Sequence, residues 1–143
     1  MSRVVIDDHL LRDVLAGEQG RELVRLAASS ELATTNLYYV RLCKSVVGAR
    51  GGAITGNWSG DRRRQLGRRL LELPDSILIP PMRAIGYRVA ELAEGERLST
   101  LGAEAVAAAE HLDASLCVWD GDDGPGTRAA ARAAGVDYRT VVL

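Results

Sequence analysis

Residues 3–11, RVVIDDHLL, join a short apolar run to two adjacent carboxylates, Asp7 and Asp8. The run over 3–6 is β-branched and predicts a buried strand, and apolar residues at helical spacing begin directly after the aspartates. The stretch therefore predicts a strand that leads straight into a helix. It also places both aspartates at the carboxyl end of that strand, where the functional groups of open parallel sheets gather.

The same alternation of strand and helix continues to the end of the chain. Further strands are predicted over 32–35, 76–80, 115–119 and 138–143, with helices between them. These strands are mostly apolar rather than alternating, which is typical of a parallel sheet covered on both faces. The sequence therefore predicts one α/β domain over 1–143, a three-layer α/β/α sandwich with a central, mainly parallel sheet of about five strands.

A glycine-rich segment and a basic helix lie in the middle of the chain. Residues 48–60 have no apolar period and predict a surface loop. The next helix, capped by Ser59 or Asp61, has a predicted buried stripe of Leu66, Leu70, Leu71 and Leu73. Its other faces carry Arg62, Arg63, Arg64, Arg68 and Arg69. These arginines predict either an RNA-binding surface that follows the phosphates or a solvated helix face.

Composition limits the possible partners and compartments. The chain has 18 basic and 19 acidic residues and a formal net charge of -1, so a charged partner such as nucleic acid must be met locally. Cys43 and Cys117 are isolated and support neither a disulfide framework nor a zinc site, which indicates a reducing compartment. No stretch approaches the ~18 apolar residues of a membrane span. We therefore expect a cytoplasmic protein with no membrane partner.

The loop WDGDDGPGT, residues 119–127, brings three more carboxylates to the end of a predicted strand: Asp120, Asp122 and Asp123. They predict either an Asp/Gly turn or, together with Asp7 and Asp8, a site for Mg²⁺ or Mn²⁺, which prefer oxygen ligands. An EF-hand is excluded because Gly124 and Ala131 stand where that loop needs oxygen ligands.

The opening VVIDDHLLRDVL resembles the first strand of response-regulator receiver domains, whose paired acids hold magnesium. That family also needs a middle strand that ends in aspartate and a lysine late in the chain, whereas the only lysine here is Lys44. A receiver-like regulatory domain is therefore the weaker alternative.

Four motifs together carry a resemblance over the whole chain. They are VVIDDHLL (4–11), NLYYV (36–40), LSTLGA (98–103), and LCVWDG (116–121) followed by RAAARAAGV (128–136). In their order and character they resemble the PIN domain family, compact α/β nucleases that include the toxins of bacterial toxin–antitoxin pairs. The resemblance implies a metal-dependent ribonuclease centre, with Asp7 and Asp120 as surviving catalytic residues and ligands of Mg²⁺ or Mn²⁺.

Two of the family's four acidic positions are substituted. Tyr39 stands where the family has glutamate, and Gly102 stands where it has its third acid. Asp8 and Asp122 are additional carboxylates, whereas Glu104 is expected to point elsewhere, because two residues turn a helix by roughly 200°. Tyr39 is expected either to stack a base or to fill the volume of the missing acid. His9 is either a general acid or base or a solvated residue at a helix start.

These substitutions predict a weak or absent metal site, because two carboxylates can be accommodated by water and backbone amides without a cation. We therefore expect a weakened or inactive relative of the PIN ribonucleases that retains binding to RNA or a partner. The alternative is an active ribonuclease in which Asp8 or Asp122 restores coordination. The resemblance also implies an antitoxin-like partner and a homodimer, for which the alanine-rich helix over 100–112 is one candidate surface and the helix over 82–95 another.

Overall fold

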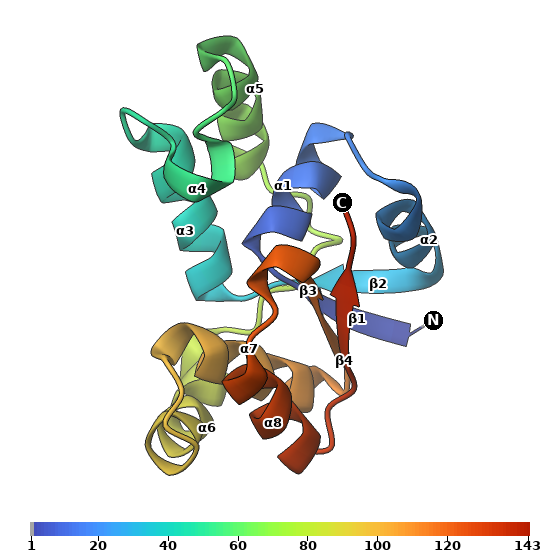
Figure 1. The fold of residues 1–143 in the computed structure, drawn as a ribbon, viewed down its shortest axis with the longest axis vertical. Coiled ribbons are helices and arrows are strands. Elements are labelled where there is room, and N and C mark those ends of the chain that lie inside the picture. Colours follow the sequence, from blue (N-terminus) through green and yellow to red (C-terminus); the bar gives the residue numbers. More distant parts are fainter. Residues whose placement is uncertain (1) are drawn as a thin grey trace.

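The computed structural model describes residues 2–143, with two strands near each end of the chain and a run of helices between the two pairs (Figure 1). The elements are β1 (Ser2–Ile6), α1 (Asp8–Ala16), α2 (Arg21–Ser29), β2 (Ser30–Ala33), α3 (Asn36–Val47), α4 (Gly52–Thr55), α5 (Gly60–Leu71), α6 (Met82–Gly95), α7 (Thr100–Leu112), β3 (Ser115–Trp119), the 3₁₀ turn η1 (Asp120–Asp122), α8 (Pro125–Ala133) and β4 (Tyr138–Val141).

The sheet has four parallel strands in the order β2-β1-β3-β4, so the α/β class and the parallel sheet are confirmed. The predicted strand over 76–80 is wrong, because this segment makes only an isolated parallel bridge between Leu78 and Ala33. Leu78 exchanges two backbone hydrogen bonds with the end of β2, of 2.9 and 3.0 Å. Pro74, Pro80 and Pro81 bracket the segment and carry no N–H, which limits further pairing.

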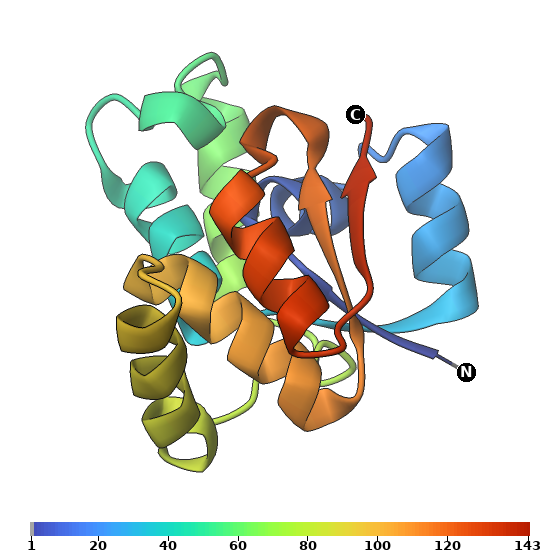
Figure 2. The ribbon, with the colours of Figure 1, turned by 60° about the horizontal axis from the view of Figure 1, so that its bottom comes forward.

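Helices cover both faces of the sheet, an arrangement compatible with the predicted three-layer sandwich (Figure 2). Val4 and Ile6 of β1 pack in a core that includes leucines from α1, α2, α3 and α5: Leu10, Leu11, Leu23, Leu42 and Leu66. Val5 points the other way and joins a second core formed with α6, α7 and α8. The two cores follow from the alternation of side chains along a strand.

The alanine-rich helix α7 lies inside this second core. All of its residues from 102 to 109 are buried within the domain, where α7 packs closely against α6. The outward side of α6 instead exposes Met82 and Tyr87, the latter at 84%.

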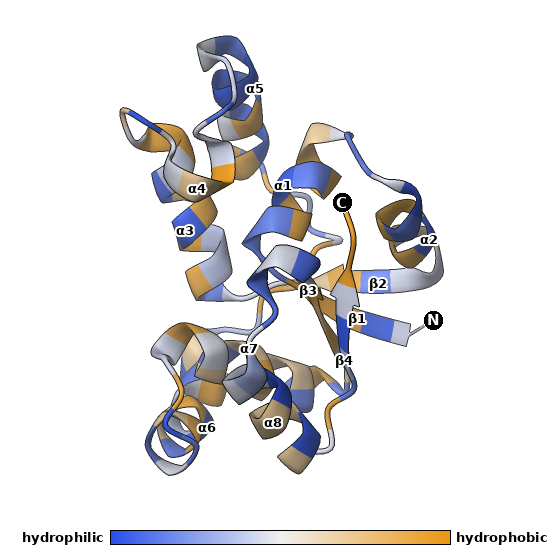
Figure 3. Ribbon diagram, in the orientation of Figure 1, coloured by the Kyte–Doolittle hydropathy of each residue, from blue (hydrophilic) through white to orange (hydrophobic). Residues whose placement is uncertain are grey.

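The segment from α3 to α5 projects beside the sheet, and Figure 3 shows how polar α5 is along its length. Ser59 caps α5 as predicted, and its side chain accepts a hydrogen bond from the amide of Arg62. The predicted leucine stripe is wrong at Leu71, which is 87% exposed, whereas Leu66 and Leu70 are buried. The glycine segment is also more ordered than predicted, since it contains the short helix α4. Among the helices of residues 2–143, none has the length and apolar character needed to cross a membrane.

Candidate acidic site at the carboxyl end of the sheet

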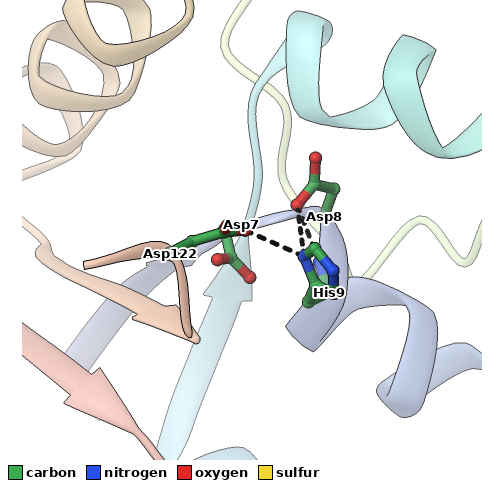
Figure 4. A group of neighbouring side chains, drawn as sticks. All are labelled: Asp7, Asp8, His9 and Asp122. Carbon is green, nitrogen blue, oxygen red and sulfur yellow. Dashed lines mark hydrogen bonds and ion pairs between the residues drawn. The ribbon is translucent and has the colours of Figure 1, made fainter. Parts of the chain in front are cut away.

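The carboxyl ends of β1 and β3 are neighbours, since Ile6 pairs with Cys117 in the parallel register. β1 ends directly at Asp7, and β3 continues into η1, which turns Asp122 back toward the start of α1. As a result Asp7, Asp8, His9 and Asp122 lie together, as Figure 4 shows.

Asp7 is the N-cap of α1 and is almost completely buried. One carboxylate oxygen accepts from the amide of Leu10 at 2.9 Å, and the other accepts from the amide of Trp119 at 2.8 Å. Burial raises the pKa of Asp7 to about 7, although these two amides act in the opposite direction. Backbone donors therefore hold both oxygens of this carboxylate.

Asp8 is fully buried and meets two positively charged or chargeable groups. Its Oδ1 accepts from the backbone amide of His9 at 2.9 Å and lies 3.1 Å from Nδ1 of the same residue. Its Oδ2 lies 2.9 Å from Nη1 of Arg41. That contact is an ion pair without hydrogen-bond alignment, so this oxygen accepts no hydrogen bond from residues 2–143. The charge of Asp8 is thus compensated by the side chain of Arg41.

His9 is buried and not solvated, contrary to one of the two alternatives for a histidine at this position. Its ring packs on Trp119 with 4.4 Å between centroids, and its Nδ1 lies 2.9 Å from Oδ2 of Asp122. Burial alone would lower the pKa of His9, but the hydrogen bond and charge of Asp8, with the charges of Asp122 and Asp7, raise it overall. Nδ1 of His9 therefore lies between the carboxylates of Asp8 and Asp122.

Each of these four residues offers a ligand atom, and the four atoms lie within 4.8 Å of one another, so the group could hold a metal ion. The fit is poor as the side chains are arranged, however. An ion would compete with His9 for Asp8 and Asp122, with Arg41 for Asp8, and with two amides for Asp7. Hard divalent cations need such oxygens to be free, so this arrangement weakens their binding.

The other acids of the loop after β3 lie apart from this group. Asp120 begins η1 and is exposed. Asp123 pairs with Arg128 at 2.9 Å and accepts from the hydroxyl of Tyr138 at 3.0 Å. The structure therefore joins Asp122, rather than Asp120, to Asp7 and Asp8.

A pocket of about 180 Å³ opens beside the acidic group. Gly102 lines it, and a Cβ added at this position would lie 2.8 Å from Oγ1 of Thr127. Tyr38 lines it as well. Tyr39 lies elsewhere, since its hydroxyl donates to the carbonyl of Leu70 in α5 at 2.6 Å. Neither proposed role of Tyr39 in the site therefore agrees with its position.

Glu104 does not line this pocket, as expected, and binds the start of α3 instead. It is fully buried, and its carboxylate accepts from the backbone amides of Asn36 and Leu37 at 3.0 and 2.8 Å. The side chain of Asn36 also donates to it at 2.8 Å. Glu104 thus caps the start of α3, the helix that carries Tyr38 and Arg41.

Three of the five arginines of α5 have partners within the chain. Arg62 pairs with Glu18 and stacks on Trp58, and Arg64 pairs with Asp61. Arg63 donates to the carbonyls of Ser45, Val46 and Gly48 at the end of α3. Arg68 and Arg69 line a shallow surface pocket with Gln65 and Glu72. Among the five arginines, only Arg68 and Arg69 in the last turn have no such partner in residues 2–143.

Arg41 is the residue of the site that sequence reasoning missed. Its signal was its helical spacing, because it lies three positions after Tyr38 and so shares a face of α3 with it. A basic residue on the helix face nearest the predicted acids is a candidate partner for them. The sequence alone does not say which aspartate it meets.

Comparison by sequence yields no relative, since no family model and no curated protein matches the chain. Among solved structures, the chain is similar to the crystal structure of PAE2754 from Pyrobaculum aerophilum, with a TM-score of 0.55 and 15% sequence identity. The alignment covers 96% of this chain and 90% of that one. At this identity the similarity shows the fold alone, so any function must be argued from the site.

Proposed function

We propose that this chain is a PIN-like RNA-binding domain in which metal-dependent cleavage is weakened or lost. The observation that carries the proposal is the internal compensation of the acidic group. Arg41 and His9 meet the charge of Asp8, and two backbone amides hold Asp7. In an active relative a divalent ion would meet these charges.

The four carboxylates of the family's site would repel one another strongly without a cation. A smaller set can be stabilised by amides and basic side chains of the protein itself. Here Gly102 adds no carboxylate to the pocket and Tyr39 lies outside it. A side chain on α3, Arg41, supplies positive charge instead. The loss of acids and the presence of an internal cation support the same conclusion.

The alternative is an active ribonuclease that uses Mg²⁺ or Mn²⁺. Asp7, Asp8 and Asp122 would then hold the ion, which when bound would supply an activated water for attack at phosphorus. For this the chain itself must first release Asp8 from Arg41 and Asp122 from His9. That rearrangement opposes tight binding.

A cleavage assay separates the two hypotheses. Labelled single-stranded RNA is incubated with the protein in Mn²⁺ or in EDTA, and both retention and integrity are measured. We expect retention in both conditions and intact RNA, with the Asp7→Asn variant indistinguishable from the unmodified protein. Cleavage that requires Mn²⁺ and disappears in Asp7→Asn would establish the active enzyme instead.

A second candidate function is binding of an antitoxin-like protein, and an apolar groove between α3 and α5 favours it. The groove has a volume of about 460 Å³, and its lining includes Tyr39, Cys43, Val47 and Leu71. Arg64 and Arg68 stand at its walls. Exposed apolar surface with basic flanks suits an acidic segment that carries apolar side chains.

A further inference from the structure

A second pocket, distinct from the acidic one, is lined by three basic side chains. It has a volume of about 360 Å³ and lies between α3 and the glycine-rich segment. Arg41 and Lys44 come from α3, and Arg50 comes from the loop that follows. Lys44 and Arg50 are exposed, and among residues 2–143 neither has a hydrogen bond or ion pair that would occupy its charge.

The wall of this pocket is held in place by a buried polar network. The hydroxyls of Ser45 and Thr55 lie 2.7 Å apart, and the amide of Thr55 donates to Ser45 Oγ at 3.1 Å. Ser45 also bonds the carbonyl of Gly51. Arg63 contributes by binding the carbonyls at the end of α3. These hydrogen bonds anchor the glycine-rich segment to α3. Arg50 therefore lines the same pocket as Lys44.

The basic pocket and the acidic pocket share one wall. Arg41 lines both, and Tyr38, one turn earlier on α3, lines the acidic one. From Tyr38 to Lys44 the helix rises by about 9 Å. Arg41 and Lys44, three positions apart on α3, thus lead from the acidic group to the unoccupied positive charges of Lys44 and Arg50.

We propose that Lys44 and Arg50, in the pocket that Arg41 also lines, bind the phosphate backbone of single-stranded RNA next to the acidic site. This inference rests on the proposed function, from which it takes RNA as the ligand. It replaces the arginine face of α5 as the main phosphate-binding surface, because Arg62, Arg63 and Arg64 are engaged within the chain. Lysine and arginine side chains that bind phosphates displace counterions, so binding here depends steeply on salt.

The test measures the anisotropy of a labelled single-stranded RNA of mixed sequence over a series of salt concentrations, with EDTA present. The double variant Lys44→Gln/Arg50→Gln removes two charges from the pocket. Arg21→Gln/Arg25→Gln on the exposed side of α2 removes the same charge elsewhere and is the matched control. Each phosphate contact of a single strand contributes about 0.7 to the slope of log K against log salt, so we expect the pocket variant to lose about 1.4.

We expect the control to keep the slope of the unmodified protein within about 0.3, less than half of one contact. An equal loss of slope in both variants, or a loss in the control alone, would overturn the assignment of the pocket. If the unmodified protein binds RNA and the pocket variant binds it with an unchanged slope, only this inference falls. If the unmodified protein binds no RNA, the proposed RNA-binding function falls with it.

Discussion

Asp7 and Asp8 are adjacent in sequence but are stabilised by different means. Asp7 is held by the amides of Leu10 and Trp119, so the protein backbone accommodates it. Asp8 is held by side chains, the imidazole of His9 and the guanidinium of Arg41. Removal of Arg41 would therefore leave a buried, partly uncompensated charge, whereas backbone donors would remain at Asp7.

The raised pKa values of Asp7 and His9 predict that stability falls as the pH rises. Burial raises the pKa of Asp7 from its ordinary 3.8 to about 7, so its contribution to stability is full below 3.8 and is lost as the pH rises through about 7. The raised pKa of His9 acts in the same direction, since its contribution is full below 6.5 and is lost at higher pH. We expect urea unfolding to give a smaller free energy at about pH 8.5 than at about pH 5.5.

The Asp7→Asn variant is the control for this pH effect. Asparagine does not titrate, so the variant should show a clearly smaller difference between the two pH values, whatever its absolute stability. If it keeps the full difference, Asp7 does not titrate near neutral pH in the folded protein.

At single residues, the sequence predicted some parts of the site and missed others. Asp7 was predictable because a strand end fixes where it lies. The sequence did not show whether Asp120 or Asp122 joins the acidic group, because a single 3₁₀ turn decides which of them faces α1. Tyr38 and Tyr39 differ by about 100° around their helix, so a small error in helix phase exchanges their roles.

Among the elements, α3 connects the features on which the proposals rest. Its first residues are capped by Glu104 from α7, its middle carries Tyr38 and Arg41, and its end meets Arg63 of α5. The position of α3 thus sets both the acidic and the basic pocket.

Glu104→Ala should therefore destabilise the protein strongly. The change leaves the amides of Asn36 and Leu37 without their acceptor inside the fold, at a cost of about 2 to 4 kcal/mol in the free energy of unfolding. Glu94→Ala on the exposed side of α6 is the matched control. It should change the free energy of unfolding by less than about 0.5 kcal/mol. Chemical denaturation of both variants measures the difference, and equal values would show that the cap on α3 contributes little.

Element boundaries were predicted best where local chemistry decides them. Ser59, one of the two predicted caps, marks the start of α5 in the sequence and in the structure. The segment over 76–80 was apolar enough for a strand, but its flanking prolines limit it to one bridge. The short helix α4 was missed because tertiary contacts from Ser45, and not any local apolar period, hold it.

At the scale of the whole molecule, the groove between α3 and α5 brings two strongly exposed apolar side chains together. Val47 and Leu71 line it at 84% and 87% exposure. A labelled acidic peptide with leucines at helical spacing should bind there, and Leu71→Glu should weaken that binding about tenfold by adding charge to the groove. Tyr87→Glu on α6 changes an equally exposed apolar residue and should leave binding unchanged. Equal weakening by both variants would show that the peptide binds without this groove.

The central claim, that the chain itself compensates its acidic group, concerns the whole molecule because β1, β3 and α3 each contribute to that group. Calorimetric titration with Mn²⁺ tests it most directly, on the unmodified protein and on Arg41→Gln, Arg68→Gln and Asp7→Asn. We expect millimolar or weaker binding to the unmodified protein and to Arg68→Gln. Arg41→Gln, which frees Asp8, should bind about tenfold more tightly, a gain of about 1.4 kcal/mol. Micromolar binding to the unmodified protein that is abolished in Asp7→Asn would contradict the account.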